Sequence, residues 1–104
     1  MYVGGQNAVD EEGNVVGAGD LAVQAKQVLQ NVEKAVKAAG GQLENIVKWN
    51  IYLVEGQDPG IGFAAFQQVA GHLENPPAIT VVKVAGFAHP DFLLEMDSVA
   101  VLPL

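Results

Sequence analysis

The sequence contains no cysteine and no arginine, and each absence excludes a class of chemistry. A chain without cysteine has no disulfide framework and no thiol nucleophile. A chain without arginine lacks the planar guanidinium that grips a carboxylate or phosphate through two parallel hydrogen bonds, and the point charge of a lysine does not reproduce that geometry. Mechanisms that depend on a thiol or on an arginine clamp are therefore excluded for this chain.

Positive charge is also scarce, because twelve Asp and Glu residues outnumber five lysines and give a net charge of −7. Binding to a nucleic-acid backbone needs clustered positive charge, whereas these lysines are scattered among acidic residues. No apolar run approaches the roughly 20 residues that cross a bilayer, and the N-terminus lacks the basic region of a signal peptide. We therefore expect a cytoplasmic protein that binds neither nucleic acid nor a membrane.

The length of 104 residues, half of them apolar, predicts one domain over residues 1–104 with one hydrophobic core. A core of this size needs no disulfide and no structural metal. The two histidines, His72 and His89, have no partner at metal-ligand spacing. We expect both to be structural or exposed, and we expect no metal site.

Two segments have the three-and-four spacing of apolar residues that is typical of amphipathic helices. The first runs from Asp20, placed as an N-cap, to Ala39, which Gly40 follows as a C-cap glycine. The second covers residues 63–73, before the stop signal at residues 75–77. Extended segments are predicted at residues 2–9, 15–16, 46–54, 78–85 and 92–102. This order predicts an α+β fold with both helices packed on one face of a sheet.

The second face of that sheet is predicted to meet another subunit. In the strand predicted at residues 78–85, apolar residues such as Ile79 and Val82 occur on both sides, so neither side is clearly polar. The two helices are enough to cover only one face. We therefore expect an oligomer.

Residues 17–22, Gly-Ala-Gly-Asp-Leu-Ala, match the G-x-G-x-x-A pattern of phosphate-binding loops that open a helix. The preceding extended segment is short, however, and Asp20 places a negative charge where a phosphate would sit. An ordinary turn followed by an N-cap is the favoured interpretation.

Glu95 and Asp97 are two residues apart on the last predicted strand, so their side chains share a face and can shift each other's proton affinity. If that face lines a pocket, one of them could serve as an acid or a base. The alternative is a solvated strand on which Lys83, from a neighbouring strand, neutralises them. Ser98, the only serine, has no nearby base and is not expected to be a nucleophile.

Several short segments occur in an order that resembles a known family. They are Tyr2-Val3-Gly4-Gly5-Gln6, QAKQVLQN at residues 24–31, Ala39-Gly40 with Leu43, Val47-Lys48, Tyr52-Leu53, Asn75-Pro76-Pro77-Ala78 and Leu94-Glu95-Met96. Together they resemble the reactive-intermediate deaminase family, also called the Rid, YjgF-like or endoribonuclease L-PSP family. The resemblance implies a chorismate-mutase-like fold, a homotrimer with small-molecule clefts between subunits, and no cofactor. Active members hydrolyse enamine and imine intermediates to 2-keto acids and ammonia.

The resemblance also implies roles for particular residues. Glu95 matches the cleft glutamate that orients water in that family, and Gly5 matches a glycine whose backbone lines the cleft. Active members carry an arginine directly after the Pro-Ala pair, where it binds the substrate carboxylate, but here that position is Ile79. We therefore expect Glu95 to be the catalytic residue, and Gly5, Ile79 and Val81 to contact the ligand. The strand that begins at Tyr2 aligns with the family's second strand, so the usual first strand is missing from this sequence: either the fold is trimmed or the true start lies upstream.

The sequence thus predicts a homotrimer of the Rid family without arginine-dependent 2-imino acid deaminase activity. The alternative is a hydrolase or deaminase that acts on a less anionic metabolite, with Glu95 orienting water. A ribonuclease or translation inhibitor is implied only by one of the family's names, and the net charge of −7 opposes it.

Overall fold

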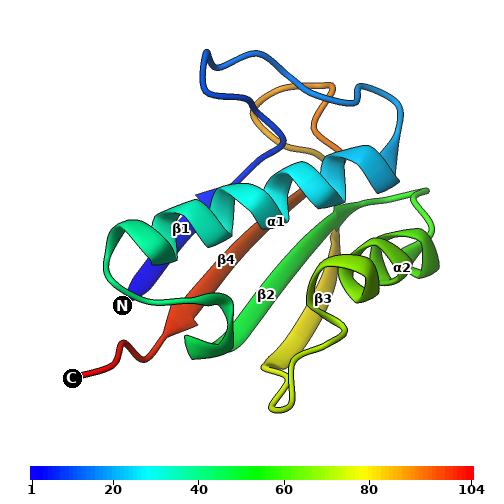
Figure 1. Ribbon diagram of the computed structural model, residues 1–104. Coiled ribbons are helices and arrows are strands. Elements are labelled where there is room, and N and C mark those ends of the chain that lie inside the picture. Colours follow the sequence, from blue (N-terminus) through cyan, green and yellow to red (C-terminus); the bar gives the residue numbers. More distant parts are fainter.

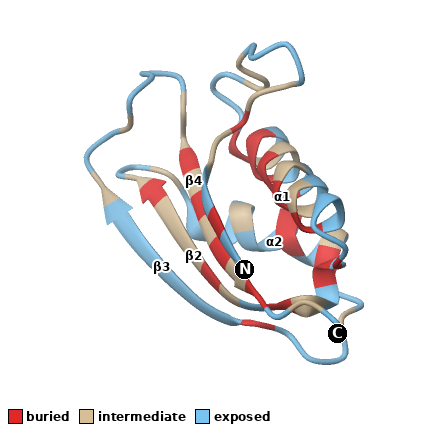
Figure 2. Ribbon diagram, turned by 90° about the vertical axis from the view of Figure 1, so that its left-hand side faces the viewer, coloured by how far each residue is buried: buried red, intermediate tan, exposed pale blue.

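The computed structural model describes residues 1–104 and places two helices on one face of a four-stranded mixed sheet (Figures 1 and 2). The strands are β1 (Tyr2–Gln6), β2 (Ile46–Val54), β3 (Ala78–Val84) and β4 (Leu94–Ala100), and the helices are α1 (Leu21–Ala38), α2 (Pro59–Ala70) and a short 3-10 helix at Leu43–Asn45. The strand order is β1-β4-β2-β3, with β2 and β3 parallel and the other neighbours antiparallel. The predicted α+β class, with both helices on one face, is confirmed.

Helix α1 begins at the predicted N-cap, because the Asp20 carboxylate accepts a hydrogen bond from the Val23 N–H at 3.2 Å. The preceding Gly17 and Gly19 have positive φ angles of 68° and 78°, which turn the chain sharply into the helix. This geometry is the predicted turn followed by an N-cap. Gly40, with a φ of 92°, ends the helix.

Helix α2 begins four residues earlier than predicted, at Pro59 instead of Phe63. The Asp58 side chain caps it by accepting a hydrogen bond from the Gly60 N–H at 2.8 Å, and Pro59 suits the first helical position because it has no N–H to leave unpaired. The helix ends at Ala70, before the predicted end at Leu73.

Side chains alternate between the two faces of the sheet. On β2, Trp49 and Leu53 are buried beneath the helices, whereas Asn50 and Tyr52 lie on the opposite face, which no element of the chain covers and which we call the open face. The expected second apolar face is therefore found only in part. The open face is polar over β2 and β4, and it is apolar at Val82 on β3, which is 45% exposed.

The core lies between α1, α2 and the helix side of the sheet. Trp49 is fully buried at its centre and makes an edge-to-face contact with Phe66 of α2, with ring centroids 5.0 Å apart. Neither helix combines the length and apolar character that crossing a membrane would need.

Candidate functional site

A small pocket opens between α2 and the β3 edge of the sheet, and its volume is about 70 Å³. Its walls include Pro59, Gly62 and Phe63 from α2, Ile79 and Val81 from β3, and Met96 from β4. All ten residues that line it are apolar or glycine, so no side chain in the wall carries a charge or a hydrogen-bonding group. The pocket can therefore hold an apolar group but offers nothing to pair with an anion.

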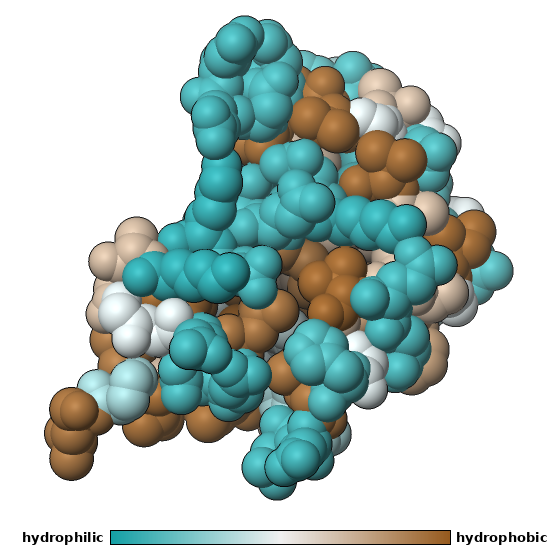
Figure 3. Space-filling view, in the orientation of Figure 1, coloured by the Kyte–Doolittle hydropathy of each residue, from teal (hydrophilic) through white to brown (hydrophobic).

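The parallel register of β2 and β3 carries Ile79 and Val81 into this pocket, because Ile79 lies beside Trp49 and Val81 beside Ile51 on the helix side of the sheet. Ile79 and Val81 remain 38% and 49% exposed, since β3 is an edge strand. Phe63 is 61% exposed at the rim. In Figure 3, hydrophobic residues reach the surface beside hydrophilic ones in the region of α2.

Glu95 lies elsewhere, on the open face, and its carboxylate occupies the space beside Gly5. A Cβ atom on Gly5 would lie only 2.6 Å from Glu95 Oε2, so a side chain at this position would displace the carboxylate. The Asn7 side chain donates hydrogen bonds to Glu95 Oε1 at 3.3 Å and to the Leu94 carbonyl at 3.4 Å. Glu95 is thus enclosed by Gly5 and Asn7, which lie at and just beyond the end of β1.

Asp97 shares the open face with Glu95, as predicted from the two-residue spacing. Its carboxylate accepts hydrogen bonds from Asn50 Nδ2 at 2.7 Å and from the Tyr52 hydroxyl at 2.9 Å. The pKa of Tyr52 is raised above its usual value, and the largest cause is this hydrogen bond to Asp97. Burial and the negative charges of Asp97 and Glu95 raise it further.

Lys83 does not neutralise either carboxylate, so this part of the sequence prediction is wrong. Lys83 is on β3, and β2 lies between β3 and β4. Its register partner is Leu53, a buried residue of the helix side, so the Lys83 side chain starts from the opposite face of the sheet. Instead, Asn50 and Tyr52 of β2, which lies directly beside β4, donate hydrogen bonds to Asp97.

The structure brings the expected site residues together as two separate pairs. Gly5 and Glu95 are in contact on the open face, and Ile79 and Val81 line the pocket on the helix side. The two pairs lie on opposite faces of the sheet within one chain. Asn7 was not predicted, because nothing in the local sequence shows that it contacts a residue 88 positions later.

Neither histidine belongs to either of these two pairs of site residues. His89 Nδ1 accepts a hydrogen bond from the Asp91 N–H at 3.0 Å, its ring packs against Phe92, and His72 is exposed beyond the end of α2. No three His, Asp or Glu side chains gather in a metal-binding arrangement.

Comparison with known proteins places these features in a family context. The family model described as Endoribonuclease L-PSP matches residues 1–102. A RutC family protein from Synechocystis sp. is 37% identical over an alignment 107 positions long, which covers 99% of this chain and 78% of the relative. The 3-aminoacrylate deaminase RutC of Acinetobacter baylyi is 35% identical over 102 residues, which cover 96% of this chain and 77% of the relative.

Solved structures share the fold over nearly the whole chain. Yeast Mmf1 has a TM-score of 0.88 and 28% identity, and the match covers 98% of this chain and 78% of Mmf1. Escherichia coli TdcF, solved with bound serine, has a TM-score of 0.87 and 26% identity, and the match covers 98% of this chain and 80% of TdcF.

Proposed function

Because the chain belongs to the endoribonuclease L-PSP family, also called the YjgF or Rid family, we propose that it forms a homotrimer that binds a small uncharged molecule in clefts between its subunits. The same proposal holds that it lacks the arginine-dependent deamination of 2-imino acids. The observation that carries it is the apolar pocket at Ile79.

The pocket disfavours any ligand whose recognition depends on a carboxylate. By the sequence resemblance, Ile79 corresponds to the arginine that holds the substrate carboxylate in active family members, and the other residues that line the pocket provide no donor. A carboxylate placed there would lose its hydration without gaining a partner, which costs several kcal/mol. An uncharged aliphatic group avoids that cost and gains about 25 cal/mol for each Å² of apolar surface removed from water.

The proposal that clefts form between subunits is supported by the position of the two pairs of site residues. The sheet separates the Ile79 pocket from Glu95 within one chain, so a cleft that uses both must combine two copies. β3 offers a surface for such contact, because it is an edge strand on which Ile79, Val81 and Val82 are exposed. An uncovered apolar edge strand promotes association with another chain.

A second candidate function is hydrolysis of an imine or enamine that carries no carboxylate. The position of Glu95 favours it, because the carboxylate is fixed by Gly5 and Asn7 yet remains partly exposed and could orient a water molecule. Water would add to the C=N carbon, the nitrogen would leave as ammonia, and a carbonyl compound would remain. The RutC relative named for 3-aminoacrylate makes deamination a reasonable reaction class, while the Ile79 pocket points to an uncharged substrate.

Two imines that differ in charge separate these possibilities. A serine dehydratase generates the 2-aminoacrylate imine, and a flavin amine oxidase generates the imine of isobutylamine. Semicarbazide traps each imine that is not hydrolysed first, so less trapped product means faster hydrolysis. We expect no acceleration with 2-aminoacrylate; acceleration like that of an arginine-bearing relative would refute the main proposal. Acceleration with the isobutylamine imine that Glu95→Gln abolishes would establish the second candidate, and unchanged turnover in Glu95→Gln would reject the role of Glu95.

The assembly is tested by light scattering on a gel-filtration column. A trimer of this 10.9 kDa chain has a mass of about 33 kDa. A mass of one chain at all concentrations would refute the shared cleft. From the net charge of −7, we expect no RNA binding at low salt. That result would reject the hypothesis, implied by the family name, that the protein is a ribonuclease.

A further inference from the structure

Helix α1 presents three amide side chains that the hydrophobic core does not explain. Gln24, Gln27 and Asn31 belong to the QAKQVLQN segment and are spaced three and four residues apart, so they follow one side of the helix. Gln24 is fully buried, and Gln27 and Asn31 are half-buried. Buried amides lower stability unless their hydrogen bonds are made, so their partners indicate what this side of the helix holds.

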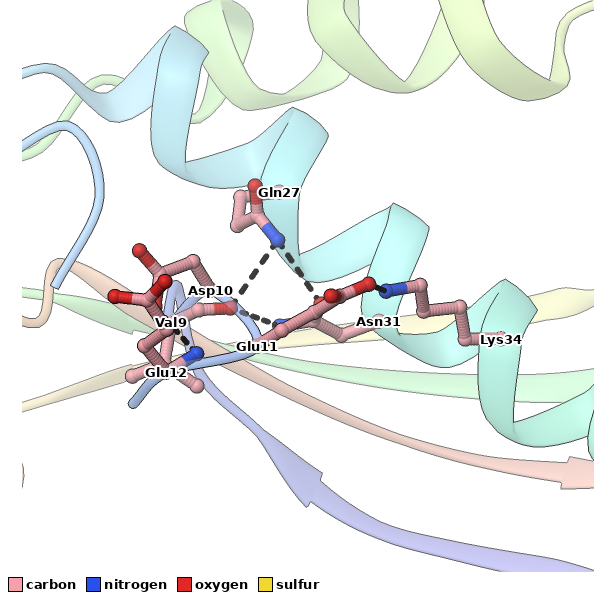
Figure 4. A network of polar contacts seen from close by, with 7 residues as sticks. All are labelled: Val9, Asp10, Glu11, Glu12, Gln27, Asn31 and Lys34. Carbon is pink, nitrogen blue, oxygen red and sulfur yellow. Dashed lines mark hydrogen bonds and ion pairs between the residues drawn. The ribbon is translucent and has the colours of Figure 1, made fainter. Parts of the chain in front are cut away.

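Gln27 and Asn31 hold the segment that follows β1 (Figure 4). Asn31 Nδ2 donates to the carbonyls of Asn7 and Val9, both at 2.9 Å. Gln27 Nε2 donates to Asn31 Oδ1 at 3.0 Å and to the Val9 carbonyl at 3.1 Å, which also fixes the orientation of the Asn31 amide. The backbone of Asn7 is therefore tied to α1.

Gln24 holds the segment that precedes Glu95. Its side chain donates to the Asp91 carbonyl at 2.8 Å and accepts from the Leu93 N–H at 2.9 Å. Both hydrogen-bonding groups of this buried amide are thus used to fix the start of β4. The amides of α1 therefore anchor both of the segments that meet at the Glu95 carboxylate.

We propose that Asn7 is a positioning residue, which α1 holds through Asn31 and which in turn fixes the orientation of the Glu95 carboxylate. The backbone carbonyls of Asn7 and Val9 hold the loop on α1, while the Asn7 side chain reaches β4, where it donates to the Leu94 carbonyl and to Glu95 Oε1. It is the only group of the chain that donates a hydrogen bond to this carboxylate. A carboxylate that orients water must keep one direction, and a single anchored donor supplies it.

The catalytic consequence rests on the proposed function, but the positioning is measured without any substrate. In ¹⁵N-labelled protein, the side-chain amide protons of Asn7 should move upfield in Glu95→Gln, because a neutral acceptor replaces a charged one. Asp97→Asn makes the same chemical change on the same face and should leave the Asn7 resonances in place. Asn7 resonances that do not respond to Glu95→Gln overturn the proposal.

The kinetic arm uses the isobutylamine imine with Asn7→Leu, which keeps the size and the backbone of residue 7 but removes the donor. We expect kcat to fall about tenfold with KM unchanged, because the ground-state pocket is untouched while the water is less well oriented. Gln6→Leu is the matched control, since the Gln6 amide bonds only to the Gly4 carbonyl. Asn31→Leu should lower kcat in the same way from a greater distance.

The outcomes separate this inference from the proposed function. If Glu95→Gln abolishes turnover and Asn7→Leu retains the wild-type kcat, Glu95 is catalytic and Asn7 does not position it. If the wild-type protein does not hydrolyse the imine, the second candidate function fails, and the Asn7 resonances alone decide whether Asn7 holds Glu95.

Discussion

Replacing Gly5 by alanine should displace the Glu95 carboxylate while leaving the fold intact. A methyl group on Gly5 would lie 2.6 Å from Glu95 Oε2, 2.7 Å from its Cδ and 3.2 Å from its Cγ. The first of these is about 0.8 Å short of the 3.4 Å at which ordinary contact begins. The atoms that must move belong to a rotatable side chain, so the carboxylate can swing away without moving the backbone.

The expected change in stability is small because two effects oppose each other. Loss of the Asn7 hydrogen bond to Glu95 costs about 1 kcal/mol. Alanine at a position whose φ is not in the left-handed region lowers the conformational entropy of the unfolded chain, which contributes about 0.4 to 1 kcal/mol in the other direction. The melting temperature of Gly5→Ala should therefore stay within about 5 °C of the wild-type value.

Gly4→Ala is the matched control, since a Cβ on Gly4 meets nothing within 4 Å. We expect Gly5→Ala to move the Asn7 side-chain resonances and to remove Glu95-dependent turnover, whereas Gly4→Ala changes neither. Calorimetry, amide spectra and the imine assay measure the three quantities. If the Asn7 resonances of Gly5→Ala are the same as those of the wild type, the Glu95 carboxylate does not occupy the space beside Gly5. A loss of more than about 3 kcal/mol in the free energy of unfolding would show that the backbone moves to relieve the clash.

Ile79→Arg should gain calorimetrically measurable binding of pyruvate, which the wild type lacks, because it places a guanidinium in the apolar wall; no binding would count against a cleft like that of the active relatives. Asn31→Leu should lower the free energy of unfolding in urea by about 1 to 3 kcal/mol, because it removes the two hydrogen bonds that the Asn31 amide donates to the Asn7 and Val9 carbonyls, while the exposed Gln30→Leu changes it little. In an ultraviolet titration, the pKa of Tyr52 should lie above its usual value, and Asp97→Asn should lower it. Because folding raises this pKa, the contribution of the Tyr52 hydrogen bond to the stability of the fold is complete below pH 10 and is lost as the pH rises through the pKa of Tyr52 in the folded protein.

The elements that sequence periodicity predicted well are those whose environment differs sharply between two sides. β2 alternates between buried residues such as Trp49 and polar residues such as Asn50, and its predicted range of 46–54 is the observed one. Helix α1 combines an apolar stripe with a capping Asp20. The start of α2 was missed because Gly60 and Gly62 have low helix propensity, and tertiary contacts with the sheet outweigh it.

The candidate site was less predictable because it depends on strand order. The spacing of Glu95 and Asp97 was enough to place both on one face, but their polar neighbours come from β2, which lies beside β4 in space and not in sequence. The same strand order removes Lys83 from their surroundings. The Asn7 contact joins positions 88 residues apart, and no local pattern encodes it.

Assembly and ligand binding should be coupled if two copies complete each cleft. Phe63, Ile79 and Val81 are exposed in one chain, so covering them is favourable whether a ligand or another subunit does so. A ligand that binds only the assembled cleft would stabilise the proposed trimer in proportion to the logarithm of its concentration above Kd. The net charge of −7 on each chain opposes association at low salt, since the subunits repel one another. Moderate salt and an uncharged apolar ligand should therefore act in the same direction, whereas an anionic ligand would add to the repulsion without finding a partner in the pocket.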